Sequence, residues 1–368
     1  MVLKQIDLTN FRQHRKTSLE FSEKLNYFVG GNGQGKTSIL EAIYYLCTTK
    51  NLNQASESDV VTFGENNFEI SGKFIEHTKD IVTISYDKLR SKKTYYLNNK
   101  LIGSATSIFG KFPIVVLTQA DHALTLGSPS DRRRFVDMVI SQASQTYLKI
   151  LIDYNKTLRQ RANVLLQIRD AKKNNLIEQL DVWTESLINL GTQIIEHRKS
   201  FEKEFNQYLK KSYNFLLKET ELPVIVYQTF VKNDADIKEN FKQLLKVERD
   251  NEIKRAINLV GPHRDEFVFK VNNLELKRFG SQGQHKTFQI ALRFGEFFYL
   301  KEKLSKTPIF IMDDVFGELD AYRASKISDY ITQIGQAFIT MTDLTNMNSL
   351  SKENTTIFNV EQGKVTYV

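Results

Sequence analysis

The feature that most constrains this chain is a glycine-rich segment near its start, Gly30-Gly-Asn-Gly-Gln-Gly-Lys-Thr37. It matches the pattern G-x-x-x-x-G-K-[ST], in which backbone N–H groups wrap a phosphate chain at the start of a helix. The flanking sequence fits, because Leu25–Val29 is typical of a short buried strand and the apolar residues after Lys36 recur at helical spacing. Lys36 would supply charge for the β- and γ-phosphates, and Thr37 a hydroxyl for Mg²⁺. The segment predicts a nucleoside triphosphate site.

A second motif supplies the carboxylates that such a site needs. Pro308-Ile-Phe-Ile-Met-Asp-Asp314 is an apolar run that ends in two acids, which is typical of a buried strand. Asp313 would hold Mg²⁺ through water, and Asp314 would orient or deprotonate the attacking water. Lys36 and Asp313 lie 277 residues apart (313 − 36), whereas simple phosphate-loop kinases and GTPases bring the two motifs much closer. A large insertion therefore separates two halves of one site.

A third segment, Phe279-Gly-Ser-Gln-Gly-Gln-His285, places glycines and small polar residues at the start of another predicted helix. The hydroxyl of Ser281 and the amides of a helix start suit a γ-phosphate. The first loop already serves that chemistry in the same chain, so we expect the second loop to close over nucleotide bound to another copy. By itself this segment is equally compatible with an ordinary turn.

Composition limits the class of protein. A length of 368 residues predicts about two domains. The single cysteine, Cys47, excludes a disulfide framework and a cysteine-rich zinc module. The apolar runs are too short to cross a bilayer, and Met1–Leu8 alternates like a strand and lacks the features of a signal peptide. We expect a soluble, cytoplasmic protein without a membrane partner, and the net charge of +8 favours polyanions such as nucleic acid.

The ordered motifs resemble the ABC-type ATPase heads of the SMC class and, within that class, the RecF family of bacterial replication and recombination-repair proteins. The matching stretches run from residue 3 to about 345 and therefore cover nearly the whole chain. Beyond the three motifs above, they comprise Asn10–Arg12, Gly127–Pro129 with Arg132, Arg133 and Asp137, Gly261–Asp265, and Glu318–Asp320.

The resemblance implies a role for each matching residue. The Walker A loop would comprise Gly30, Gly31, Asn32, Gly33, Gln34, Gly35, Lys36, Thr37 and Ser38. Asp313 matches the magnesium-binding Walker B carboxylate and Asp314 the catalytic one. The remaining matches are Ser281 and Gly283 in a signature loop acting in trans, Asp320 in the D-loop, Gln119 in the Q-loop, and Arg12 beside adenine or ribose. ABC ATPases usually have Glu where Asp314 stands and His in the region of Thr340–Thr342, and these departures indicate slow turnover.

The resemblance also implies the architecture and the function. The fold would be α/β, an ABC/SMC-type P-loop ATPase head formed by residues 1–126 and 258–368, with a mainly helical arm inserted over 127–257. With ATP and Mg²⁺ the protein would form a homodimer that clamps double-stranded or gapped DNA without sequence preference. It would be a weak, DNA-stimulated ATPase, associated with the nucleoid, and would help load recombinase with RecR and RecO. The alternatives are the ATPase part of an OLD-type nuclease, another P-loop nucleotide enzyme, and a scaffold that binds ATP without hydrolysing it.

Three further segments have open interpretations. The run Arg132–Arg134 could contact DNA phosphates or pair with Asp131 or Asp137, in a helix that we expect Ser130 to cap. A second set of basic residues is either a DNA-binding stripe or a solvated edge strand: Lys88, Arg90, Lys92, Lys93 and Lys100. The segment Gly261–Glu266 is structural or lies near the nucleotide, and its His263 lacks the neighbours that a metal ligand needs.

Overall fold

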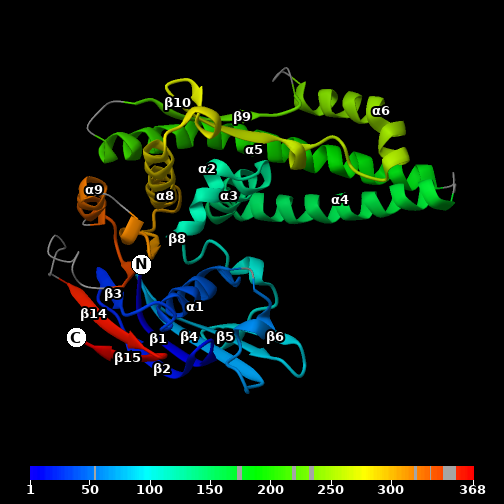
Figure 1. The fold of residues 1–368 in the computed structure, drawn as a ribbon. Helices are drawn as coiled ribbons and strands as arrows, with labels where there is room; N and C mark the ends of the chain where they lie inside the picture. The colour runs from blue at the N-terminus through cyan, green and yellow to red at the C-terminus, as the bar shows by residue number, and fades with distance from the viewer. Residues whose placement is uncertain are drawn as a thin grey trace. The chain divides into compact units, whose positions relative to one another are not determined.

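The computed structural model describes residues 1–53, 55–171, 176–217, 221–231, 236–318, 321–331, 333–342 and 354–368 (Figure 1). The chain forms two compact units. Unit 1 comprises Met1–His122, Lys211–Thr220 and Lys286–Val368, and unit 2 comprises Ala123–Lys210 and Glu221–His285. Each unit is described by itself below.

The first sheet of unit 1 is antiparallel. Its order is β2 (His14–Glu20), β1 (Val2–Phe11), β4 (Asn67–Ile75), β5 (Lys79–Asp87), β6 (Lys92–Leu97) and β7 (Lys100–Leu101). Burial alternates along β4, so one face packs on the core and the other faces solvent. The turn between β6 and β7 is formed by Asn98 and Asn99, both at positive φ, as expected for a tight asparagine turn.

The second sheet of unit 1 contains both halves of the predicted site. Its order is β15 (Lys364–Tyr367), β14 (Thr355–Glu361), β3 (Leu25–Val29), β13 (Ala337–Met341), β12 (Ile309–Asp313) and β8 (Ile114–Thr118). All pairs are parallel except β14 with β15. Every residue of β3 and β13 is buried, as in parallel sheets that are covered on both faces.

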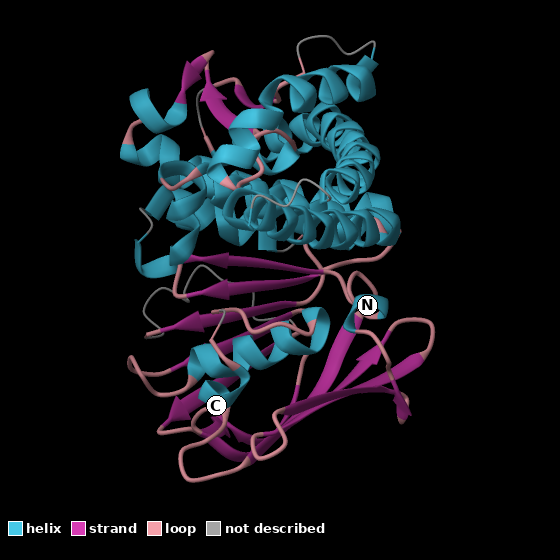
Figure 2. Cartoon of the chain, turned by 90° about the vertical axis from the view of Figure 1, so that its right-hand side faces the viewer, coloured by secondary structure: helices cyan, strands magenta, loops and turns pink. Residues whose placement is uncertain are grey.

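The helices of unit 1 cover this parallel sheet. Helix α1 (Lys36–Thr48) lies between the two sheets, as Figure 2 shows, and its apolar residues share one core with both. On α8 (Gln282–Leu304) Phe294 stacks on Phe310 of β12, and α9 (Ala321–Ile331) packs against α8 through Tyr330. Short segments complete the unit: η1 (Glu57–Val60), η2 (Ala105–Ser107), η3 (Gln119–Asp121) and η7 (Phe316–Glu318).

Unit 2 is mainly helical. Its helices are α3 (Pro129–Ala143), α4 (Gln145–Ala171), α6 (Ile237–Arg255), the short α7 (Leu276–Phe279) and most of α5 (Ile177–Leu216), and α2 (His122–Leu126) precedes them. A small antiparallel sheet has the order β11 (Leu274–Glu275), β10 (Glu266–Val271) and β9 (Pro223–Gln228), with η6 (Pro262–Arg264) before β10.

The bounds of the compact units differ from those of the predicted domains. The units divide after His122 and after His285, and Lys211–Thr220 belongs to unit 1, whereas the predicted arm covered 127–257 and the predicted head resumed at residue 258. The physical reason is that β10 pairs with β9, so this strand joins the inserted unit. The prediction that Ser130 caps α3 is wrong. Ser128 is the N-cap, because Pro129 fits the first helical position and Asp131 completes a capping box with Ser128.

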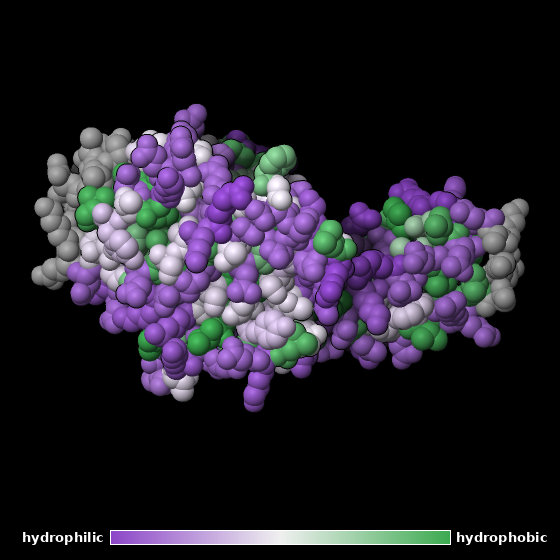
Figure 3. Space-filling view, turned by 90° about the horizontal axis from the view of Figure 1, so that it is seen from below, coloured by the Kyte–Doolittle hydropathy of each residue, from purple (hydrophilic) through white to green (hydrophobic). Residues whose placement is uncertain are grey.

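The surface and the burial of individual side chains complete the description of the fold. Among the described residues, no helix is both long and apolar enough to cross a membrane. The face drawn in Figure 3 is mostly hydrophilic, with apolar residues scattered over it. Cys47 is buried in α1.

Candidate nucleotide-binding site

The glycine-rich segment forms a loop between β3 and α1, as predicted. Gly30, Gly33 and Gly35 all have positive φ, and Gly35 is the N-cap of α1. A Cβ on Gly30 would lie 2.3 Å from the carbonyl oxygen of Val360 in β14. A side chain at this position therefore collides with the neighbouring strand, so the close approach of loop and sheet requires glycine.

Lys36 begins α1 and points back over the loop. Its Nζ donates to the carbonyl oxygens of Gly30 at 2.6 Å and Gly31 at 2.7 Å. Burial lowers the pKa of Lys36, although the nearby carboxylates of Asp314 and Asp313 oppose this shift. A charged amine that is held by two neutral carbonyls is well placed to exchange them for phosphate oxygens.

The two predicted carboxylates meet the loop at the end of β12. The hydroxyl of Thr37 donates to Oδ1 of Asp313 at 3.0 Å, and the hydroxyl of Thr340 on β13 donates to the same oxygen at 2.8 Å. The amide of Asp314 donates to Oγ1 of Thr340 at 2.8 Å. Burial raises the pKa of Asp313, and the hydrogen bonds from Thr340 and Thr37 oppose this. Thr340 therefore fixes both acids, a role that its own sequence position did not reveal.

Gln119 follows β8, and its side chain reaches the acids at the end of β12. Its Nε2 donates to the carbonyl oxygen of Asp314 at 3.1 Å. Two residues later, the carboxylate of Asp121 accepts two hydrogen bonds from Arg293 on α8. One comes from Nε at 3.0 Å and the other from Nη2 at 2.6 Å. Arg293 also donates to Glu296 at 2.8 Å. This charged cluster ties the segment that carries Gln119 to α8.

Two cavities adjoin the loop. The smaller holds about 170 Å³ and is lined by Asn32–Ser38, Asp313, Asp314, Gln13 and Thr340. The larger, of about 840 Å³, shares Gln13, Thr37 and Ser38 with it. Arg12 lines the larger cavity, and the 97% exposed ring of Phe63 lies on its wall.

Arg12 is held by an acid of α1. Its Nε and Nη2 donate to the two carboxylate oxygens of buried Glu41 at 2.8 and 2.9 Å, and its Nη1 donates to the carbonyl of Asp59 at 3.2 Å. The guanidinium is therefore fixed at the wall of the larger cavity, and its place beside a nucleoside stays a prediction.

The donor set suits a hard divalent cation. The Thr37 hydroxyl and the Asp313 carboxylate are oxygen ligands that already touch, and Mg²⁺ is usually held by one or two such groups together with water and phosphates. Within the described ranges no group of three or more His, Cys, Asp or Glu could hold a metal alone. A cation held by Thr37 and Asp313 would take its remaining ligands from water and from nucleotide oxygens.

Comparison with known proteins places the chain in a family. The RecF/RecN/SMC N-terminal domain model matches residues 2–366. A relative from Chloroherpeton thalassium, named DNA replication and repair protein RecF, is 36% identical over 353 residues, which cover 93% of this chain and 95% of the relative. One of the same name from Leptospira interrogans is 33% identical over 371 residues and covers 99% of both chains. The chain belongs to the RecF family.

Solved structures agree with this family. A RecF–ATP structure from the RecFOR pathway superposes with a TM-score of 0.90 at 28% identity, covering 100% of this chain and 97% of that one. The Smc head domain of Pyrococcus furiosus gives a TM-score of 0.58 at 14% identity, covering 100% of this chain and 96% of that one, and supports the fold alone. The expected α/β ATPase-head fold is confirmed.

The other RecF-family motifs lie in unit 2 or outside the described residues. Ser281 precedes α8 and caps it, because its Oγ accepts from the Gln284 amide at 3.2 Å while its own amide donates to the Gln284 side chain at 3.0 Å. Gly283 lies in the first turn of α8. Asp320 lies outside the described residues.

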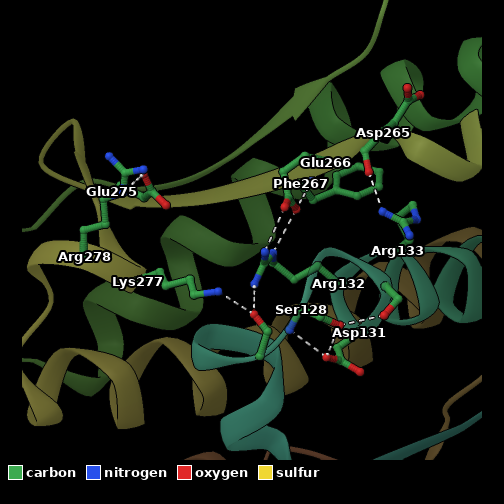
Figure 4. Close-up of polar contacts among 12 residues, drawn as sticks. Ser128, Asp131, Arg132, Arg133, Asp265, Glu266, Phe267, Glu275, Lys277 and Arg278 are labelled. Atoms are coloured by element: carbon green, nitrogen blue, oxygen red, sulfur yellow. Dashed lines mark hydrogen bonds and ion pairs between the residues drawn. The ribbon is translucent and has the colours of Figure 1, made fainter. Parts of the chain in front are cut away.

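The arginine run of α3 is largely engaged inside unit 2 (Figure 4). Arg132 forms two hydrogen bonds with the carboxylate of Glu266, both at 2.9 Å, and Arg133 donates to the carbonyl of Asp265 at 2.7 Å. The partners of Arg132 and Arg133 are therefore not the predicted Asp131 and Asp137. Asp131 takes part in the cap of α3, and Asp137 pairs with Arg198.

The segment Gly261–Asp265 also makes its contacts within unit 2. His263 lies between the hydroxyl of Tyr154, at 2.8 Å from Nδ1, and the carbonyl of Asn258, at 3.2 Å from Nε2. Burial lowers the pKa of His263 to about 4. A neutral ring with its proton on Nε2 satisfies both neighbours, which supports the structural interpretation of this segment.

The basic stripe is interrupted. Lys93 forms an ion pair with Glu57 at 2.5 Å and donates to the carbonyl of Thr49, and Arg90 lies 3.7 Å from Asp87. Lys88 lines the larger cavity instead. Lys93 is therefore engaged within unit 1, whereas Arg90, Lys92 and Lys100 are exposed, and for these both interpretations stay open.

Proposed function

We propose that this chain is an ATP-dependent clamp for double-stranded and gapped DNA in replication and recombinational repair. The observation that supports the proposal is the direct contact of Thr37 with Asp313 beside the Lys36 loop, since it joins two segments that lie far apart in the chain and that a triphosphate site would need together. Relatives named DNA replication and repair protein RecF and a solved RecF–ATP complex support the choice of nucleotide and of process.

Different residues of the site would hold different parts of the nucleotide. The loop amides of Gly30–Ser38 and the Lys36 amine would hold the phosphates, and the larger cavity beside Arg12 would take the nucleoside. Thr37 and Asp313 would hold Mg²⁺, whose charge offsets that of the phosphates. Asp314, fixed through Thr340 and Gln119, would orient or deprotonate water.

A second copy would complete the site. Ser281, at the start of α8, would contact the γ-phosphate held by the other protomer, together with Gly283. Asp320 would act as the D-loop residue that the RecF resemblance implies. ATP then stabilises the dimer because it contacts both protomers, and hydrolysis releases them. The shorter side chain of Asp314 relative to Glu is consistent with weak hydrolysis used as a switch.

The DNA contacts would be made to phosphates. A net charge of +8 favours a polyanion, and such contacts are insensitive to sequence and strongly weakened by salt. By its RecF-family membership, the clamp would recognise gapped or damaged replication intermediates and help load recombinase with RecR and RecO.

Two variants test the proposal. Lys36→Ala should abolish ATP-dependent dimerisation, measured by light scattering, and ATP-dependent DNA binding. Ser281→Arg should leave binding of a fluorescent ATP analogue to the monomer nearly intact while it blocks dimers. Loss of monomer binding in Ser281→Arg would place that loop in cis and contradict the clamp.

Hydrolysis assays separate the alternatives. The clamp predicts slow ATP hydrolysis that rises with DNA and with protein concentration. DNA cleavage would instead favour the OLD-type nuclease, and ATP binding without any hydrolysis would favour the scaffold.

A further inference from the structure

We infer that the turn of the C-terminal hairpin, Gln362–Gly363 between β14 and β15, is a positioning element for the phosphate loop. This inference rests on the proposed ATP site. It gives the last residues of the chain a role in nucleotide binding, although they lie more than 300 residues from that loop in the sequence.

Two hydrogen bonds join the turn to the centre of the loop. The amide of Gln362 donates to Oε1 of Gln34 at 2.7 Å, and the amide of Gly363 donates to the backbone carbonyl of Gln34 at 2.9 Å. Gln362 and Gly363 both have positive φ, with values of 48° and 75°. This turn conformation directs two successive amides at one residue of the loop.

The hairpin also packs closely against the start of the loop and against Gln13. A Cβ on Gly363 would lie 2.4 Å from the carbonyl oxygen of Gln13, a residue that lines the smaller cavity, and a Cβ on Gly30 would lie 2.3 Å from that of Val360 in β14. A Cβ on Gly35 would lie 3.6 Å from the Cα of Gly363. The hairpin therefore packs against the start of the loop through β14 and is bonded to its centre at Gln34, and its turn lies against Gln13 of the cavity wall.

The consequence for nucleotide binding follows from the planarity of the peptide bond. The carbonyl of Gln34 and the N–H of Gly35 belong to one peptide plane and point in opposite directions, because the bond is trans. When Gly363 holds that carbonyl, the direction of the Gly35 N–H is fixed as well, pointing away from the hairpin. A loop that binds phosphate through its amides needs this orientation before the ligand arrives.

A control lies within the same hairpin. The hydroxyl of Tyr367 on β15 accepts from the amide of Glu20 on β2 at 3.1 Å, so it anchors the hairpin at a place away from the loop. Tyr367→Phe removes this bond alone, whereas Gly363→Ala disturbs the contact with the loop. Comparing the two variants separates loosening of the hairpin from misplacement of the phosphate loop.

The test measures the loop without and with nucleotide. In the nucleotide-free protein, hydrogen–deuterium exchange of residues 30–36 should become faster in Gly363→Ala and stay unchanged in Tyr367→Phe. The affinity for a fluorescent ATP analogue should fall about tenfold in Gly363→Ala, the scale of one or two lost hydrogen bonds, and less than twofold in Tyr367→Phe. If Gly363→Ala does not fold, Gln34→Met, which removes only the side-chain acceptor, should show the same faster exchange.

The outcomes distinguish the two proposals. Unchanged exchange of residues 30–36 in both Gly363→Ala and Gln34→Met would overturn the positioning role, whatever the affinity. Absence of analogue binding by the wild-type protein would overturn the proposed function, and the exchange experiment would still decide the role of the hairpin.

Discussion

The hydroxyl of Thr37 donates directly to Oδ1 of Asp313 at 3.0 Å, although 276 residues separate them in the sequence. Thr340 donates to the same oxygen from the neighbouring strand. The two groups expected to hold Mg²⁺ thus touch each other and share Thr340 as a support, and such a fixed geometry lowers the entropic cost of binding a cation.

Asp313→Asn tests this arrangement. Asparagine keeps an Oδ1 acceptor for Thr37 and Thr340 but loses the charge that attracts a cation. We expect ATP hydrolysis to fall on the order of 100-fold, while binding of the ATP analogue in EDTA changes less than twofold. Titrating Mg²⁺ against hydrolysis and binding checks both expectations, and Mg²⁺-dependent hydrolysis at the wild-type rate would contradict the assignment.

The cluster of Arg293 with Asp121 and Glu296 should be important for stability. Arg293→Met leaves two buried acids without their cation, which costs about 3–5 kcal/mol. Arg293→Lys keeps the charge but loses the two-point contact with Asp121, so we expect a smaller loss, about half as large. Urea unfolding of the three proteins measures the free energies, and equal stability of wild type and Arg293→Met would disprove the role.

The local parts of the site could be predicted from the sequence. The bounds of β3 and the start of α1 follow from short-range patterns of apolar residues and glycine, and both agree with the structure. The acids at the end of β12 are also predicted from a local signal, because an apolar strand that ends in two carboxylates can be recognised within a few residues.

The remaining parts depend on contacts between distant segments. Nothing in its neighbourhood marks Thr340 as the residue that fixes Asp313 and Asp314, or Gln34 as the partner of Gly363. The boundary predicted at residue 258 differs from that of the compact units because the pairing of β10 with β9 is not visible in either strand alone. The cap of α3 was misplaced by two residues because several serines near Pro129 satisfy the same preference.

Two arginines of the same run in α3 should differ in their effect on stability. Arg132 is buried against Glu266, so Arg132→Met should destabilise unit 2 by about 2–3 kcal/mol. Arg134 is exposed, and Arg134→Met should change stability by less than about 0.5 kcal/mol.

For DNA binding we expect the opposite order, with the larger effect from the exposed Arg134. If DNA phosphates bind at the face of α3 that carries Arg134, Arg134→Met lowers the slope of log affinity against log salt by about one, and Arg132→Met leaves it unchanged. Denaturation curves and salt titrations of the two variants provide both comparisons. A stability loss in Arg134→Met as large as that in Arg132→Met would refute the distinction.

Protonation of His263 should weaken the fold at low pH. Its pKa is about 4 in the folded protein because the ring is buried, against an ordinary value of 6.5. The unfolded chain therefore binds the proton more readily between these values, and stability falls as pH decreases from about 6.5 towards 4. The full difference of 2.5 pKa units (6.5 − 4) corresponds to about 3 kcal/mol.

The measurement compares wild type with His263→Gln, whose side chain can donate to Asn258 and accept from Tyr154 without titrating. Free energies of unfolding at pH 7.5 and pH 5 should show a larger loss on acidification for wild type, by about 1–2 kcal/mol, because only part of the titration window is crossed. Taking the difference between the two proteins removes the contributions of all other titrating groups that they share. Parallel pH profiles would mean that His263 stays neutral in the unfolded chain as well, or that protonation is accommodated between Tyr154 and Asn258, and either result would contradict the prediction.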